Sequence, residues 1–110
     1  MGIAVAHMRL IFLTLQKTDI EYKLMLISQT KMNLTNSVND LLTVGTDLDS
    51  DSPEYKTLRA RQEKLMLIDK RLEEQMQRYK SKLSMVETEL ESVDKMLNNN
   101  IKRAFTYGGG

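Results

Sequence analysis

The sequence of 110 residues contains no cysteine and no tryptophan, and it has one proline and one histidine. Without cysteine, disulfide bonds and thiolate metal sites are excluded. The single histidine, His7, cannot supply a multi-histidine metal site within one chain. Two phenylalanines and four tyrosines are few for a globular core. Eight methionines partly replace aromatic residues, and their flexible side chains suit exchangeable packing.

An excess of charge of one sign is also missing. Sixteen Lys and Arg face fifteen Asp and Glu, and the formal net charge is +1. Basic residues of the second half alternate with acidic ones, and no aromatic residues are interleaved on which bases would stack. This pattern is typical of a solvated helix face, and we expect no nucleic-acid partner.

Motifs for catalysis are absent, because the sequence has no glycine-rich phosphate loop, nucleophile elbow or His-Glu zinc motif. Asp47, Asp49 and Asp51 resemble the start of a calcium loop. However, Ser52 replaces the turn glycine, and Leu58 stands where a bidentate Glu would close the site. An acidic, solvated turn is therefore favoured. We expect no catalytic residue, no cofactor and no metal, and thus no enzyme.

An amphipathic helical pattern runs from about Glu54 to Phe105 without glycine or proline. A helix of this length needs a partner of similar length, because a compact domain of this size cannot enclose it. Two consecutive steps of four predict a stutter, which relaxes supercoiling, at each of two places. These are Ile68, Leu72 and Met76, and then Val93, Leu97 and Ile101. The apolar residues of this face are Leu65, Ile68, Leu72, Met76, Tyr79, Leu83, Val86, Leu90, Val93, Leu97 and Ile101.

The whole chain reads as one all-α domain, an extended antiparallel two-helix hairpin that is coiled-coil-like and assembles into a bundle or filament. We expect a helix over about residues 3–44, an acidic turn over 45–53, a helix over about 54–105 and a flexible glycine tail over 106–110. Gly45 suits a left-handed cap at the end of the first helix. Ser52 or Asp51 can cap the second helix, which begins at about Pro53.

The first helix carries a heptad seam that Lys17 and Lys31 interrupt at equivalent places. Seam lysines can select a register or a partner, or they can simply lie at the wet edge of an imperfect seam, which is the favoured interpretation. The seam residues are Leu10, Leu13, Lys17, Ile20, Leu24, Ile27, Lys31, Leu34, Val38 and Leu41.

The segment over residues 3–15 is apolar on nearly every side of a helix. It is shorter than the roughly 20 apolar residues of a membrane-spanning helix, and Arg9 lies near its middle. Neither the basic start nor the cleavage site of a signal peptide is present. We therefore expect no cleavable signal, and the location is left open between export or the cell surface without one and the cytoplasm.

Because only one side of a helix faces its partner, Ile11, Phe12 and Leu15 are expected to remain exposed. Burial between copies is favoured over purely internal packing, and contact with a membrane surface comes third. Each large side chain buried between copies would contribute about 1.5–3 kcal/mol. The expected self-association residues are Ile3, Val5, Met8, Leu10, Ile11, Phe12, Leu13, Leu15, Leu97, Ile101 and Phe105.

The layout over residues 49–105 resembles the axial proteins of flagellar and type III secretion systems, especially the needle subunits. The similar features are the turn from Asp49 to Pro53, the long second helix, and the ending with Val93-Asp94, residues 98–100, Ile101 and Phe105. The resemblance implies a small helical hairpin that is exported through a secretion apparatus and polymerises into a tubular filament.

We therefore expect a non-enzymatic structural protein that forms a homo-oligomer or filament of a secretion system or surface appendage. The alternative is a small coiled-coil adaptor or secretion chaperone that presents its methionine-rich seam to a partner helix.

Overall fold

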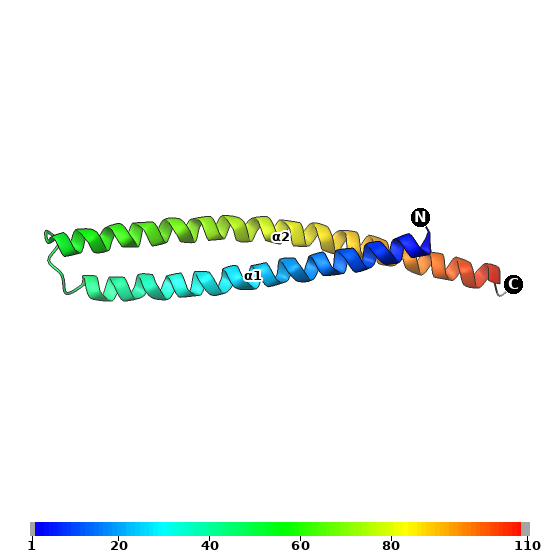
Figure 1. The fold of residues 1–110 in the computed structure, drawn as a ribbon, viewed down its shortest axis with the longest axis horizontal. Helices are drawn as coiled ribbons and strands as arrows, with labels where there is room; N and C mark the ends of the chain where they lie inside the picture. Colours follow the sequence, from blue (N-terminus) through cyan, green and yellow to red (C-terminus); the bar gives the residue numbers. More distant parts are fainter. Residues whose placement is uncertain (1, 109–110) are drawn as a thin grey trace. The chain divides into compact units, whose positions relative to one another are not determined.

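The computed structural model describes residues 2–108, which form two α-helices, α1 (Ile3–Gly45) and α2 (Pro53–Gly108) (Figure 1). No strand occurs in this range. The predicted all-α, two-helix fold is confirmed. The predicted glycine tail is wrong at its start, because α2 continues to Gly108. Gly109 and Gly110 lie outside the described residues.

Both helices tolerate many threonines, which are β-branched and lower helix propensity. Each of these threonine hydroxyls donates a hydrogen bond to the carbonyl oxygen four residues earlier, at 2.7–3.0 Å. This bond satisfies the hydroxyl without breaking the helix. In α1 the threonines are Thr14, Thr18, Thr30, Thr35 and Thr43.

The chain forms two compact units, and each contains a segment of both helices. Unit 1 comprises Met1–Lys23 and Tyr79–Gly110, whereas unit 2 comprises Leu24–Arg78. Unit 2 includes the turn between the helices, over residues 46–52.

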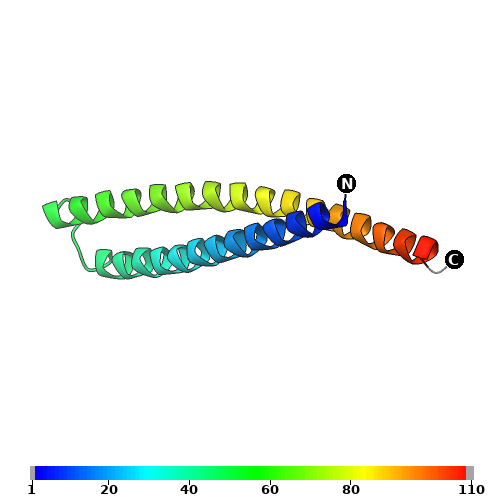
Figure 2. The same cartoon turned by 45° about the vertical axis from the view of Figure 1, so that its right-hand side comes forward.

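In unit 1 the two helices run antiparallel. Arg9 Nη2 donates to Glu89 Oε2 at 2.6 Å, and Lys17 Nζ lies 3.9 Å from Glu87 Oε1. Residues later in α1 therefore pair with residues earlier in α2. Figures 1 and 2 both show that α2 continues past the start of α1 in this unit.

The core of unit 1 is a heptad seam between the helices. On α1, Ala6, Leu13 and Ile20 follow one another at heptad intervals and are at most 4% exposed. Half-buried Leu10 and Lys17 fill the alternate positions. The predicted register of α1 is therefore confirmed in this unit. From α2 the buried residues are Val86, Val93 and Leu97.

Unit 2 continues the same periodicity with weaker burial. Ile27 is its one buried residue among those described, at 8% exposure. The other seam positions are half-buried, and they include the polar residues Lys31, Gln62 and Asp69. Because polar side chains and a glycine occupy part of this seam, less apolar surface is removed from water than in unit 1.

The predicted stutters of α2 are wrong. In unit 2 the inward positions run through Leu65, Asp69 and Leu72, while Ile68 is 43% exposed. The physical reason is that Leu65 and Leu72 both pack toward α1, so the regular heptad puts position 69 rather than 68 between them, and Asp69 forms an ion pair there with Lys31 at 3.3 Å. In unit 1 the seam likewise ends on half-buried Asn100, and Ile101 is 42% exposed.

Gly45 does not form the expected left-handed cap, because no glycine in the described range has a positive φ. Instead, the amides of Asp47 and Leu48 donate to the carbonyls of Val44 and Gly45, each at 3.3 Å. A Cβ at Gly45 would lie 2.9 Å from Leu58 Cδ2. The glycine is therefore suited to the close approach of the helices in unit 2 rather than to a turn.

The N-terminus of α2 is capped by Ser52, as expected for one of the two candidates. Ser52 Oγ accepts a hydrogen bond from the amide of Tyr55 at 3.1 Å, and Pro53 occupies the first helical position. The same hydroxyl donates to the Asp49 carbonyl at 2.7 Å, which ties the cap to the turn.

We expect Ser52→Ala to lower the free energy of unfolding by about 1 kcal/mol, because it removes the hydroxyl that accepts the hydrogen bond from the Tyr55 amide. Urea unfolding followed by circular dichroism measures this change. Ser50→Ala is the matched control in the same turn, since its side chain is exposed. Equal effects of the two substitutions would contradict the assignment of the cap.

Candidate self-association site

In unit 1, the side of α1 that faces away from the seam is also apolar. Its large side chains are 56% to 71% exposed. We call this surface the outer face of α1, and it consists of Ala4, Val5, Met8, Ile11, Phe12, Leu15 and Tyr22, with Thr18 and Asp19 between them.

The outer face has its own heptad spacing. Steps of four and three alternate along Ala4, Met8, Ile11, Leu15, Thr18 and Tyr22. A helix that is apolar on opposite sides is normally buried on both of them. Sequence reasoning missed Ala4 and Tyr22, although their spacing from Met8 and Leu15 is the signal that identifies them.

The corresponding side of α2 is polar in unit 1. Ser81, Ser84, Thr88, Glu91 and Lys95 are all exposed there. One exposed apolar residue, Met85, stands out on this surface at 66% exposure. Within unit 1, α2 is therefore amphipathic, whereas α1 has two apolar sides.

Three of the predicted self-association residues lie between the helices instead. Leu13 and Leu97 are buried in the core of unit 1, at 2% and 5% exposure, and Leu10 is half-buried. Within the described structure they pack between the helices of the hairpin, and their contact with a second copy stays a prediction. Removing residues 1–15 would delete part of this core, so point substitutions on the outer face separate assembly from folding better.

The remaining predicted residues are exposed at the ends of the helices. Ile3 at the start of α1 is 41% exposed, whereas Ile101 and Phe105 on α2 are 42% and 78% exposed. Residues 101–106 are all exposed, because α2 continues past the start of α1 (Figure 2). We call residues 101–106 the overhang of α2.

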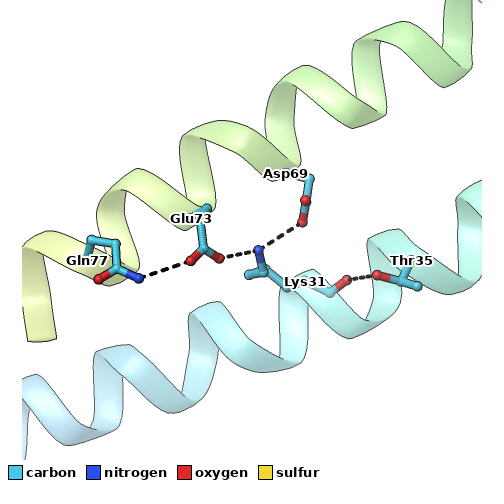
Figure 3. Close-up of polar contacts among 5 residues, drawn as sticks. All are labelled: Lys31, Thr35, Asp69, Glu73 and Gln77. Carbon is cyan, nitrogen blue, oxygen red and sulfur yellow. Dashed lines mark hydrogen bonds and ion pairs between the residues drawn. The ribbon is translucent and has the colours of Figure 1, made fainter.

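The seam lysines pair with acidic residues of the other helix. Lys31 Nζ donates to Glu73 Oε2 at 2.6 Å and lies 3.3 Å from Asp69 Oδ1 (Figure 3). Glu73 also accepts a hydrogen bond from Gln77 at 3.1 Å, on its other oxygen. The Lys31 side chain is 23% exposed, so its stem packs between the helices while its ammonium pairs with both carboxylates.

Lys17 in unit 1 is less constrained. Its ammonium is 3.9 Å from Glu87, and its side chain is 38% exposed. This geometry matches a lysine at the wet edge of a seam, whereas that of Lys31 favours a role in register selection.

The hydrogen bond to Glu73 raises the pKa of Lys31 above its ordinary 10.5; partial desolvation opposes the rise, and the contact with Asp69 adds to it. Because the folded pKa is the higher one, the stabilisation is fully present below pH 10.5 and is lost as pH rises through the folded pKa.

We expect Lys31→Gln to weaken this loss of stability in alkaline solution. Urea unfolding at a series of pH values measures the free energy of unfolding of both proteins. An identical decrease of this free energy with rising pH in the variant and the original protein would contradict the expectation.

Unit 2 contains an open groove of about 510 Å³ between α1 and α2. Apolar side chains from both helices contribute to its lining, and the exposed Ile68 is one of them. The lining residues are Ser37, Asp40, Leu41, Val44, Arg61, Lys64, Leu65 and Ile68.

Over residues 2–108, no group of three or more His, Asp or Glu is placed to hold a metal ion. Neither α1 nor α2, as far as the structure describes them, has a stretch long and apolar enough to cross a membrane.

The chain matches no protein-family model, no curated protein and no solved structure. Its function must therefore be inferred from its own surfaces.

Proposed function

We propose that this chain is a non-enzymatic structural protein whose copies assemble through their long helices into a filament of a secretion system or surface appendage. The observation that carries the proposal is the outer face of α1, where five large aliphatic or aromatic side chains and Tyr22 are exposed on a helix already packed on its other side. Exposed apolar surface of this extent is typical of interaction sites.

A surface that pairs with the same surface of a second copy closes into a dimer, so a filament built on such a pair requires a second contact. The overhang of α2 offers a second surface through Ile101 and Phe105. Lys102 and Arg103 make the overhang basic, whereas Asp47, Asp49 and Asp51 make the turn acidic. These opposite charges favour contacts between the overhang of one copy and the turn of another at low ionic strength.

Light scattering and negative-stain microscopy of the purified protein test the proposal. We expect assemblies much larger than 12.7 kDa, growing with protein concentration. Higher salt should weaken the contacts between the overhang and the turn. A monodisperse monomer at all accessible concentrations would contradict the proposal.

A second candidate function is a coiled-coil adaptor or secretion chaperone that binds one partner helix. The groove of unit 2 favours it, because helix-in-groove recognition uses an apolar channel between helices. This function predicts a monomer or small oligomer that binds a helical peptide. Ile68→Glu should then abolish peptide binding and leave the oligomeric state unchanged, whereas Thr57→Glu, away from this groove, is the control.

A further inference from the structure

We infer that the outer face of α1 pairs with the same face of a second copy of this chain, antiparallel and about a twofold axis close to Phe12. This inference rests on the proposed self-assembly and specifies its contact.

The spacing of the outer face identifies the occupant as a helix. Alternating steps of four and three are those of a seam that packs against one helix along its length. In unit 1, the outward side of α2 is mainly hydroxyl and charged side chains, so it does not offer a matching surface. The outer face of α1 is the surface of this unit that offers apolar residues at the same spacing.

Size complementarity fixes the direction and the register. When two outer faces run antiparallel with Leu15 of one copy against Ile11 of the other, Tyr22 meets Ala4 at both ends of the contact. A large ring thus lies over a small side chain, which is how layers interdigitate in close-packed cores. Met8 meets Thr18 in the layers between.

The flanking residues agree with this register. Phe12 of one copy lies beside Phe12 of the other at the twofold axis, where aromatic rings can pack edge to face. On the opposite flank, His7 lies across from Glu21, so an imidazole meets a carboxylate. The carboxylate of Asp19, which falls near Val5, already pairs with Lys23 of its own chain at 2.9 Å.

A parallel pair loses these matches. Each seam residue would then meet its own counterpart, so Tyr22 would face Tyr22 and Ala4 would face Ala4, and layers too wide and too narrow would alternate. His7 and Glu21 would also lie far apart along the pair. The antiparallel arrangement is therefore the one that the side chains fit.

The contact is short, since residues 4–22 span roughly 28 Å of helix. An interface along one face of this length is smaller than that of a typical stable complex. The antiparallel contact forms a symmetric dimer. Further contacts, such as those of the overhang, then join the dimers into larger assemblies.

Disulfide cross-linking tests the pairing, because the chain has no cysteine of its own. Single-cysteine variants Ile11→Cys and Leu15→Cys are mixed while reduced, allowed to exchange and then oxidised. Ala4→Cys and Tyr22→Cys are treated in the same way. Mass spectrometry distinguishes mixed disulfides from those between identical chains, and Ser84→Cys on α2 measures random collision.

We expect mixed 11–15 and 4–22 disulfides to form at least tenfold faster than the Ser84→Cys dimer. Predominant 11–11 and 15–15 disulfides, which a parallel pair would give, would overturn the inference. So would rates no faster than the control in a protein that still sediments as large assemblies, and then the proposed self-assembly would stand. A protein that sediments as a monomer throughout would overturn both.

Discussion

Leu13→Ala is expected to lower the free energy of unfolding of unit 1 by about 2–5 kcal/mol, whereas Leu15→Ala should change it by less than about 0.5 kcal/mol. The two leucines are two positions apart on α1 but lie on opposite sides. Leu13 is 2% exposed in the seam, and Leu15 is 65% exposed on the outer face. Truncating Leu13 removes buried methyl groups and leaves a cavity, and truncating Leu15 does neither.

Chemical unfolding followed by circular dichroism measures both variants, at a protein concentration low enough to keep the chains apart. Working with separated chains is essential, because Leu15 would gain burial in an assembly and assembly itself raises apparent stability. A loss at Leu15 comparable to that at Leu13 under these conditions would show that the outer face packs within its own chain.

This pair of leucines also shows how far the sequence determines the fold. The heptad seam of α1 was predictable because its period is regular and the chain offers one long partner helix. Leu13 and Ile20 are buried as that period requires. The cap at Ser52 was predictable for a similar reason, since a serine followed by a proline marks a helix start by local chemistry alone.

Where the sequence interpretation failed, a contact between the helices decided the outcome. The sequence pattern placed Ile68 in the seam because isoleucine is apolar, but the seam keeps its regular heptad through position 69, where Asp69 forms an ion pair with Lys31. The expected cap at Gly45 relied on the freedom of glycine to adopt a left-handed backbone conformation. In the structure, it is the missing side chain that matters, because a Cβ there would lie 2.9 Å from Leu58 Cδ2. Neither partner could be identified before the register of α1 against α2 was known.

The candidate site was predictable in part from the same period. The heptad of residues 3–15 placed Leu10 and Leu13 in the seam and left Ile11, Phe12 and Leu15 exposed. Leu10 and Leu13 belong to the seam, and Ile11 and Leu15 belong to the outer face. The structure confirms this division and extends the outer face to Tyr22, which lies beyond the predicted segment.

The double substitution Ile11→Asp and Leu15→Asp is expected to raise the dissociation constant for self-association by at least about 100-fold. Each side chain is about 60% exposed in the single chain. Each would therefore lose on the order of 1–2 kcal/mol of burial between copies. The new carboxylates add a desolvation cost and repel each other across the twofold axis. Sedimentation velocity over a concentration series measures the change.

Folding should survive this double substitution, because neither residue contributes to the seam and both positions already face water in the single chain. Circular dichroism should show unchanged helix content. Ser81→Asp together with Ser84→Asp adds the same charge to the exposed side of α2 and is the matched control. Equal weakening by the two double variants would mean that net charge, rather than the outer face of α1, governs assembly. Assembly of the α1 variant at the original concentration would exclude the outer face as the contact between copies.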